Sequence, residues 1–372
     1  MAIGLIFLLF ILAVFMPKSK MLYFGIMLYM WLLFSLNTGA PDTSIYEWLY
    51  GANIPHAFEP LFTALMTVCQ KLHFPYFGFR MAVISIMLVF LHLAFKVTDQ
   101  YKTLALAMYL VSPFPWQVSG IRAALACAIL IYAMASFAED PKKNTIKYCV
   151  FLLIATLVHY SSVLFAVLLL ARIEPARKRI VTYLVIGIIG TMIVQHSDIL
   201  FELVSRITDR EKILTWLSGG AEKEGYPSLT GFAVEMIVLV GNIVLTAGSR
   251  MIVSQRDPGG EKTGIANLIC DMNVITLLFL PFFRLNDTYM RLLYAMHGLN
   301  VILYSMTAFM LQEKEGTPND GHACRSLALR TQISLYTLIV PLWTYLIAIY
   351  QNWPYFGTEE SVFSFLGKNL LF

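Results

Sequence analysis

The stretch that decides the fold reads VSGIRAALACAILIYAMASFA and covers residues 118–138. Beyond Arg122 it has no acidic or basic side chain, and roughly 20 such residues are enough for a helix to cross a bilayer. A charged side chain in such a segment is energetically costly and by default indicates a functional site. The same holds for His159, which lies within LVHYSSV, residues 157–163. The pattern is typical of a membrane protein in which an arginine and a histidine belong to a functional site.

The composition extends this interpretation to the whole chain. Of its 372 residues, 58% are hydrophobic and 13% are charged, and the mean hydropathy is +0.68. Ordinary globular domains have a charged fraction of about 25%. We therefore predict an all-α polytopic membrane protein. Residues 1–16 show neither a basic start nor a cleavage site, so we expect a retained membrane segment there. The five cysteines lack the spacing of a zinc site or a disulfide framework.

The apolar segments predict about 10–12 transmembrane helices in one integral membrane domain, residues 1–372. The predicted spans are 3–16, 22–36, 77–95, 103–115, 120–138, 147–171, 180–195, 229–250, 266–283, 290–311 and 332–350. Residues 59–73 are too short for a span, and we expect a re-entrant or interfacial helix there. With the loop before it, this helix forms an outer segment, 37–76. A second outer segment, a large loop, covers residues 197–230.

The segment 147–171 is predicted to break at the sequence His-Tyr-Ser-Ser, residues 159–162. As one crossing, it would put the basic residues that follow it opposite those that precede it. As two short helices, it puts both basic clusters on one face, as the positive-inside rule favours. Most Lys and Arg residues then lie on the inner side, and both termini face out. Irregular backbone at membrane depth is tolerated only where it lines a protein cavity, so the break itself indicates a site.

On this topology Arg122, His159, Arg284 and Arg291 converge at the outer leaflet. The planar fork of an arginine matches phosphate oxygens, so a lipid-linked pyrophosphate is a natural ligand, although outer arginines also extend to lipid headgroups. The small residues after Arg122 favour a face that packs against protein. His159 is a candidate general base, orienting residue or phosphate contact. The alternative is a structural histidine bonded by a neighbouring serine.

The acidic candidates lie in the first outer segment. A base that deprotonates an incoming sugar hydroxyl is expected among Asp42, Glu47 and Glu59. Glu59 precedes Pro60, and an acid at the start of a helix is also explained by the helix dipole. Aromatic residues of the outer loops are candidates for stacking on sugars or for an interfacial belt; they are Tyr46, Trp48, Tyr50 and Trp216.

Five short motifs, in order along residues 37–300, resemble the EpsG/Wzy group of bacterial polysaccharide polymerases. They are PDTSIY (residues 41–46), FEPLF (58–62), SGIRAALA (119–126), VHYSSVLF (158–165) and Arg284 followed by Tyr289-Met290-Arg291. The resemblance implies a glycosyltransferase-C-like fold in the bacterial inner membrane. It also implies an enzyme that joins undecaprenyl-pyrophosphate-linked repeat units of O-antigen or exopolysaccharide type at the periplasmic face, where the outer loops would lie.

The resemblance also assigns roles to residues. Arg122 and His159, with Glu59 and Asp42 in less settled roles, are the expected catalytic residues. Residues expected to bind substrate are Arg284, Arg291, Tyr160, Tyr289 and Tyr46. We expect no metal, no cofactor and no nucleic acid. The expected partners are the lipid-linked glycan, membrane lipid, a chain-length regulator and a flippase.

Two other functions stay open. A different lipid-linked-sugar glycosyltransferase or ligase would place its catalytic acid in the first outer loop, so Asp42 would be indispensable and His159 would not. A flippase or transporter of lipid-linked sugars would also contain intramembrane charges and broken helices. Against a transporter, the chain halves show no repeat and the ionisable groups gather at one face. An enzyme lengthens glycans in detergent, whereas a flippase needs two compartments.

Overall fold

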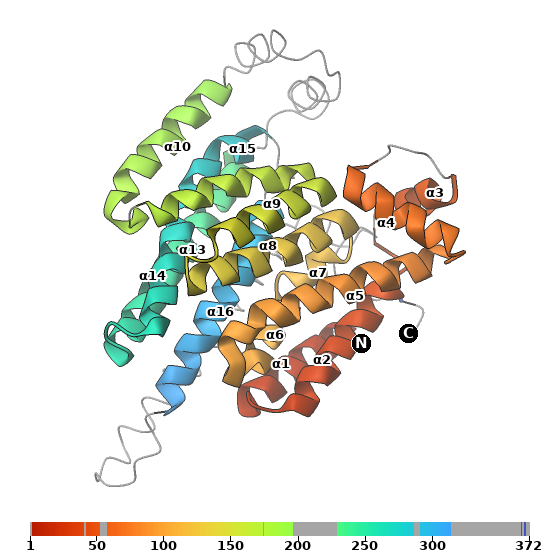
Figure 1. Ribbon diagram of the computed structural model, residues 1–372, viewed down its shortest axis with the longest axis horizontal. Coiled ribbons are helices and arrows are strands. Elements are labelled where there is room, and N and C mark those ends of the chain that lie inside the picture. The colour runs from red at the N-terminus through yellow and green to blue at the C-terminus, as the bar shows by residue number, and fades with distance from the viewer. Residues whose placement is uncertain are drawn as a thin grey trace.

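The computed structural model describes residues 2–40, 42–52, 58–173, 175–195, 229–285 and 291–313, together with 366, 368 and 369. This part of the chain is a bundle of helices (Figure 1). Its β pairing is confined to an isolated bridge between Asn37 and Asn369. Five of the described helices are long and apolar enough to cross a membrane. The predicted all-α polytopic fold is confirmed.

The N-terminal half of the bundle contains α1 (Ala2–Phe15), α2 (Lys20–Ser35), α3 (Thr43–Ala52), α4 (Pro60–Lys71), α5 (Tyr76–Phe95), η1 (Lys96–Tyr101), α6 (Lys102–Val111), α7 (Phe114–Gln117) and α8 (Ile121–Glu139). The remaining elements are α9 (Thr145–Val158), η2 (Tyr160–Arg172), η3 (Ala176–Arg179), α10 (Ile180–Gln195), α13 (Leu229–Arg256), α14 (Glu261–Ile275), η4 (Thr276–Phe279), α15 (Leu280–Leu285) and α16 (Arg291–Glu313). Each predicted span except 332–350, which lies outside the described residues, coincides with one or more of these elements.

The predicted span 103–115 is longer than the helix that forms there. α6 ends at Val111, and Ser112 has an extended backbone with φ −163° and ψ 132°. The ring of Pro113 disfavours a helical conformation in the preceding residue. The chain therefore leaves α6 at this point and re-enters a short helix, α7, before α8 begins.

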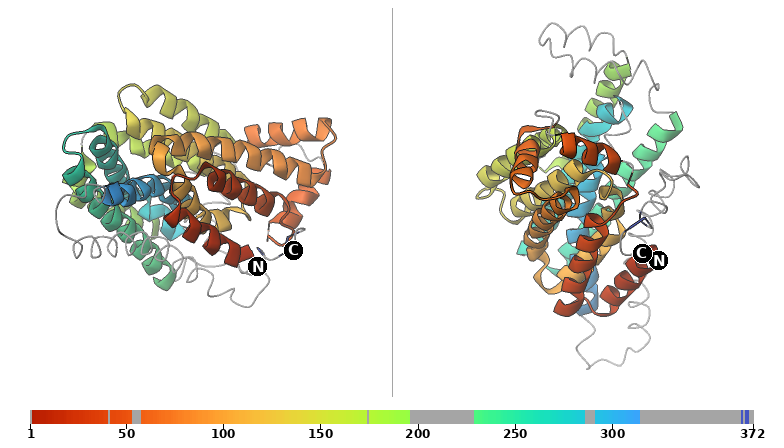
Figure 2. Two further views of the ribbon diagram at one scale, coloured as in Figure 1. Left: turned by 90° about the horizontal axis from the view of Figure 1, so that it is seen from below. Right: turned by 90° about the vertical axis from the view of Figure 1, so that its right-hand side faces the viewer.

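α8, which contains most of the stretch 118–138, lies at the centre of the bundle. It packs against α5, α9 and α16 and is buried along nearly its whole length, as expected for a helix that is apolar on every side. A Cβ atom at Gly298 of α16 would overlap the end of the Ile131 side chain of α8, so the glycine leaves that side chain room to pack between the two helices. α16, in blue, runs through the middle of the bundle in both views of Figure 2.

The predicted break in segment 147–171 is present at His159. α9 ends at Val158, His159 is extended with φ −154° and ψ 113°, and η2 begins at Tyr160. η2 then packs along α9, where the Tyr148 hydroxyl donates to the Phe165 carbonyl at 2.7 Å. The two elements form a hairpin that returns the chain to the end of the bundle at which α9 started.

Basic side chains gather at that end of the bundle. The Nζ atom of Lys18 lies 4.9 Å from the centre of the Phe309 ring near the end of α16. Arg177, in η3, pairs with Asp271 of α14. We call this the basic end. α3 and α4 lie at the opposite end, beside the start of α5 (Figure 1), and we call that the site end.

Candidate active site

Glu59 is the centre of a polar cluster at the site end. It occupies the position before the first residue of α4, but its side chain makes no capping hydrogen bond to that helix. Instead its Oε2 atom accepts a hydrogen bond from Nη1 of Arg122 at 2.6 Å. Its Oε1 atom lies 3.1 Å from Nδ1 of His159 and 3.3 Å from the backbone N–H of Tyr160, which donates to it. The carboxylate thus joins the starts of α4 and α8 to the break after α9.

Arg122 is held in the first turn of α8 by partners on two sides. Its Nε donates to the Tyr46 hydroxyl at 2.9 Å, and its guanidinium carbon lies 4.4 Å from the centre of the Phe58 ring. The rings of Tyr46 and Phe58 stack at 5.2 Å. Cation–π contacts of this kind add to the ion pair with Glu59. Within the described part of the chain, Nη2 of Arg122 makes no hydrogen bond, so this group remains available to a ligand.

His159 is positioned by the break itself. Its backbone N–H donates to Ala155 at 2.8 Å, and its carbonyl accepts from the N–H of Ser162 at 3.0 Å. Ser162 therefore stabilises the turn through its backbone, and the imidazole has Glu59 as its side-chain partner. Among the described residues the imidazole therefore pairs with a carboxylate and not with a serine hydroxyl.

The exposure of the cluster differs from residue to residue. The side chain of Glu59 is 6% exposed, whereas those of Arg122 and His159 are 26% and 23% exposed. Burial raises the pKa of the Glu59 carboxyl, but the hydrogen bond with His159 and the charge of Arg122 outweigh burial and lower the pKa to about 2. Glu59 is therefore an ionised, weakly basic group beneath two side chains that reach the surface.

The charge of Glu59 also determines which imidazole nitrogen is free. An ionised carboxylate can only accept hydrogen bonds, so Nδ1 of His159 must carry the hydrogen. In the neutral imidazole, Nε2 is then the nitrogen with a lone pair. Among the described residues Nε2 has no hydrogen-bond partner. The arrangement places an imidazole nitrogen with a lone pair on His159 and a cation on Arg122, both in contact with the Glu59 carboxylate.

For the other predicted site residues the structure describes fewer contacts, and for some it does not describe the side chain. Tyr160 contributes its backbone N–H to the cluster, and the residue as a whole is 57% exposed. Asp42 is half-buried; its carbonyl accepts from the N–H of Tyr46, and its carboxylate makes no contact with Glu59, Arg122 or His159 among the described residues. Arg284 lies in α15 and Arg291 begins α16, but their side chains lie outside the described residues. Tyr289 and nearly all of the loop 197–230 also lie outside them.

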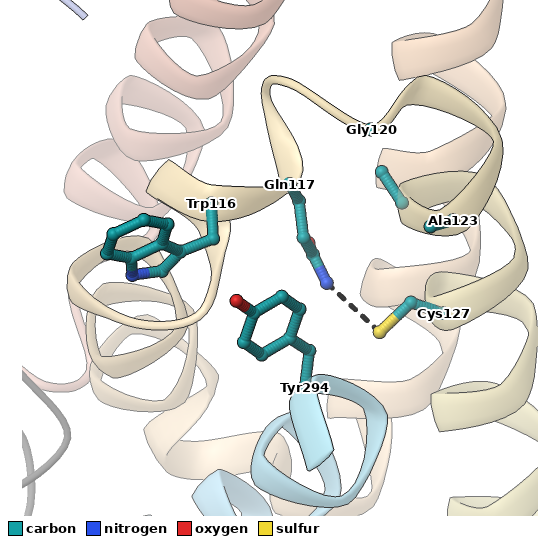
Figure 3. A pocket seen from close by; sticks show the side chains of 7 residues that line it. Trp116, Gln117, Gly120, Ala123, Cys127 and Tyr294 are labelled. Atoms are coloured by element: carbon teal, nitrogen blue, oxygen red, sulfur yellow. Dashed lines mark hydrogen bonds between the residues drawn. The ribbon is translucent and has the colours of Figure 1, made fainter. Parts of the chain in front are cut away.

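The structure adds residues for which the sequence interpretation had no role. Phe58, whose ring contacts the guanidinium of Arg122, directly precedes Glu59 in the FEPLF motif. This adjacency is the signal that could have identified it. A small cavity lies between α7, α8 and α16 (Figure 3). It is lined by Trp116, Gln117, Gly120, Ala123, Ala124, Cys127 and Tyr294. Because Tyr294 is three residues after Arg291, the start of α16 lies close to the start of α8.

Comparison with known proteins places these residues in a family. A family model described as the EpsG family matches residues 20–356. This range contains Glu59, Arg122 and His159 as well as the cavity. A search of curated proteins and a search of solved structures found no match. The match covers most of the chain, so the protein belongs to the EpsG family, whose membership supports a polysaccharide-polymerase-like role in a membrane.

Proposed function

We propose that this protein is a glycosyltransferase that polymerises undecaprenyl-pyrophosphate-linked oligosaccharide repeat units at the outer face of the bacterial inner membrane. The proposal rests mainly on the cluster in which buried Glu59 binds both Arg122 and His159. Family membership supports the same class of reaction. The positive-inside rule, applied to the basic end, supports an outward-facing site end.

In the proposed reaction, a hydroxyl of the acceptor repeat unit attacks the anomeric carbon of the donor sugar. The new glycosidic bond forms as the bond from that carbon to the pyrophosphate oxygen breaks. His159 Nε2 takes the proton of the attacking hydroxyl, and the lipid pyrophosphate leaves with the electron pair. A well-placed general base typically contributes about 100-fold to 10,000-fold to the rate.

Glu59 acts through His159 in this mechanism. A carboxyl with a pKa of about 2 is a poor proton acceptor near neutral pH. Its acceptor contact with Nδ1 instead keeps Nε2 free and stabilises the imidazolium that forms when the proton arrives. We therefore assign Glu59 as a positioning residue and His159 as the base.

Arg122 stabilises the leaving pyrophosphate through Nη2 and the remaining N–H groups. Preorganised donors of this kind act where charge develops during the reaction. Since Glu59 already balances the charge of Arg122, binding a pyrophosphate needs further positive charge. We assign this role to Arg284 and Arg291, which flank the α15–α16 connection, because Arg291 is one turn away from Tyr294 at the cavity.

The proposed function is tested with surface polysaccharide from a strain that lacks the gene. The strain is complemented with wild type, Arg122→Ala, His159→Ala or Asp42→Asn at matched protein level. A polymerase predicts a single repeat unit in the deletion strain, no ladder with either cluster variant and a full ladder with Asp42→Asn. The alternative is a glycosyltransferase whose catalytic acid is Asp42. It predicts no ladder with Asp42→Asn and a full ladder with His159→Ala.

A purified assay separates an enzyme from a flippase. The protein in detergent is incubated with lipid-linked repeat units, and the glycan length is measured. Chain lengthening supports the enzyme. Lengthening that is absent in detergent, together with movement of the lipid-linked units across reconstituted vesicles, would overturn the proposal in favour of the transporter.

A further inference from the structure

Arg80 is a charged side chain of the apolar helix α5 that has no role in the proposed mechanism. It is 0% exposed, and a charged group within a membrane-spanning segment by default indicates a functional contribution. Its hydrogen bonds within the described part of the chain reach a carbonyl and a hydroxyl, and none of them reaches a carboxylate. The groups that Arg80 contacts therefore indicate what it does.

The first contact of Arg80 is with the end of α2. Its Nε and Nη2 both donate to the carbonyl of Phe34, at 3.1 Å and 2.5 Å, and its guanidinium carbon lies 5.3 Å from the centre of the Phe34 ring. Carbonyls in the last turn of a helix have no partner within that helix, and they lie at the negative end of its dipole. Arg80 thus supplies both hydrogen bonds and positive charge to the end of α2.

The second contact of Arg80 is with the first residue of α3, which lies beside the start of α5 (Figure 1). Nη1 of Arg80 donates to the hydroxyl oxygen of Thr43 at 3.1 Å, and Thr43 is buried. Residues 36–42 connect α2 to α3 and belong to neither helix, so no helical hydrogen bonds fix one relative to the other. Arg80 joins both helices to α5 and thereby determines where the first turn of α3 lies.

α3 extends this contact into the candidate active site. Tyr46 lies one turn after Thr43, and its hydroxyl accepts from Nε of Arg122 at 2.9 Å. The Tyr46 ring also stacks on Phe58 at 5.2 Å, and Phe58 in turn contacts the guanidinium of Arg122. A shift of α3 would therefore move a hydrogen-bond acceptor of Arg122 and disturb the ring that lies against its guanidinium.

We propose that Arg80 is a positioning residue for the reaction. By holding Thr43 it fixes Tyr46, and Tyr46 fixes the guanidinium of Arg122. The assignment rests on the proposed function, in which Arg122 stabilises the leaving pyrophosphate. Arg80 itself is fully buried and does not touch the substrate. Because charge develops on the pyrophosphate in the transition state, a misplaced Arg122 should lower kcat more than it raises KM for the lipid-linked substrate.

The sharpest test is Thr43→Val, since valine has nearly the same shape and lacks the oxygen that accepts from Arg80. The measurement is kcat for glycan lengthening by the purified full-length protein in detergent. A misplacement of about 1 Å can cost about 100-fold in rate, and we expect kcat to fall by about tenfold to 100-fold. Thr43→Ser keeps the hydroxyl and should retain the wild-type kcat.

Thr67→Val is the matched control for this variant. Thr67 is half-buried on α4 in the same outer segment, and its hydroxyl donates to the Thr63 carbonyl within its own helix. The substitution is the same, but no contact with Arg80 is lost, so kcat should equal that of wild type. The thermal midpoint of each variant shows whether it is folded.

A second pair of variants tests whether Arg80 acts through Tyr46. Arg80→Met removes the guanidinium, and Tyr46→Phe removes the hydroxyl that accepts from Arg122. If both act on the same contact, each should lower kcat, and the double variant should be no slower than the slower single variant. A purely stabilising Arg80 would lower the thermal midpoint without this dependence on Tyr46. Thr43→Val keeps the proposal testable if Arg80→Met does not fold.

Hydrogen–deuterium exchange of the α3 peptide, residues 43–52, gives a readout that is independent of activity. Exchange should rise in Thr43→Val, because α3 loses its contact with Arg80. It should stay at the wild-type level in Thr43→Ser and Thr67→Val.

Three kinetic results would overturn the assignment. They are a wild-type kcat in folded Thr43→Val, an equal loss of kcat in Thr43→Ser, and losses that multiply in Arg80→Met/Tyr46→Phe. A wild-type protein that does not lengthen glycans would instead refute the proposed function, and the exchange of α3 would then decide whether Arg80 holds Tyr46. Unchanged exchange in Thr43→Val would overturn the assignment in either case.

Discussion

Oε1 of Glu59 lies 3.1 Å from Nδ1 of His159, although the two residues are 100 positions apart in the chain. Glu59 immediately precedes α4, and His159 immediately follows α9. The same carboxylate binds Arg122 at the start of α8. Three helix ends therefore meet at one charged group, and a change in any of the three residues alters the surroundings of the other two.

We predict that Glu59→Gln lowers the rate of chain extension about 100-fold or more, within the range ascribed to general bases. A neutral amide can turn its NH₂ group toward Nδ1, which favours the tautomer whose Nε2 carries the hydrogen and cannot act as a base. The measurement is the initial rate of glycan lengthening by purified protein at saturating lipid-linked substrate.

Glu47→Gln is the matched control for this variant, because Glu47 is exposed on α3 and belongs to the same outer segment. Its rate should equal that of wild type. If folded Glu59→Gln were as fast as Glu47→Gln, the positioning role of Glu59 would be refuted.

We predict that Arg122→Met destabilises the protein by about 1–3 kcal/mol. Removing one partner of a fully buried ion pair costs about 3–5 kcal/mol, and the effect is smaller here because the side chain of Arg122 is 26% exposed. The double variant Glu59→Gln/Arg122→Met leaves no unpaired charge and should recover much of the loss. Thermal midpoints in detergent measure both effects. A double variant as unstable as the sum of the single variants would contradict a direct pair.

We predict that the carboxyl of Glu59 makes stability depend on pH only in acid. Folding lowers its pKa from 4.5 to about 2, so the ionised group stabilises the folded state fully above the unfolded value. This contribution disappears as the pH falls from about 5 through 2. The thermal midpoint of wild type should therefore fall more steeply below about pH 5 than that of Glu59→Gln, and the two slopes should agree at neutral pH. Equal slopes in acid would contradict an ionised Glu59.

The pH dependence of kcat distinguishes Glu59 from His159 as the base. If Glu59 were the base, the rate would persist well below pH 4, since its pKa is about 2. A histidine base, by contrast, loses its lone pair when the imidazole is protonated. We predict that kcat has fallen before the pH reaches the range in which Glu59 is protonated, measured in detergent with enzyme that is stable over the range used. A rate that is flat down to about pH 4 would exclude the histidine base.

The sequence predicts the site residues that are unusual for their surroundings, but it does not predict how they meet. Arg122 and His159 stand out because charged or titratable groups are rare in apolar segments, and the break at His159 follows from the distribution of basic residues. The role of Glu59 was not predictable from its position before Pro60, which is equally suited to a helix start. The contact of Tyr46 with Arg122 was also not predictable, since an aromatic residue in an outer loop is equally suited to contact a substrate or a lipid.

We predict, finally, that a pair of amides fixes α14 against α16. Asn273 and Asn300 exchange two hydrogen bonds, of 2.7 Å and 2.9 Å, and their exposed fractions are 1% and 0%. Asn273→Leu leaves the partner amide without a bond and should destabilise the protein by about 1–2 kcal/mol. Asn273→Leu/Asn300→Leu removes both polar groups and should be less unstable than the sum of the single variants. Thermal midpoints of the four proteins in detergent measure the coupling. Strictly additive losses would mean that each amide contributes through its packing alone, because a reciprocal bond cannot be lost twice.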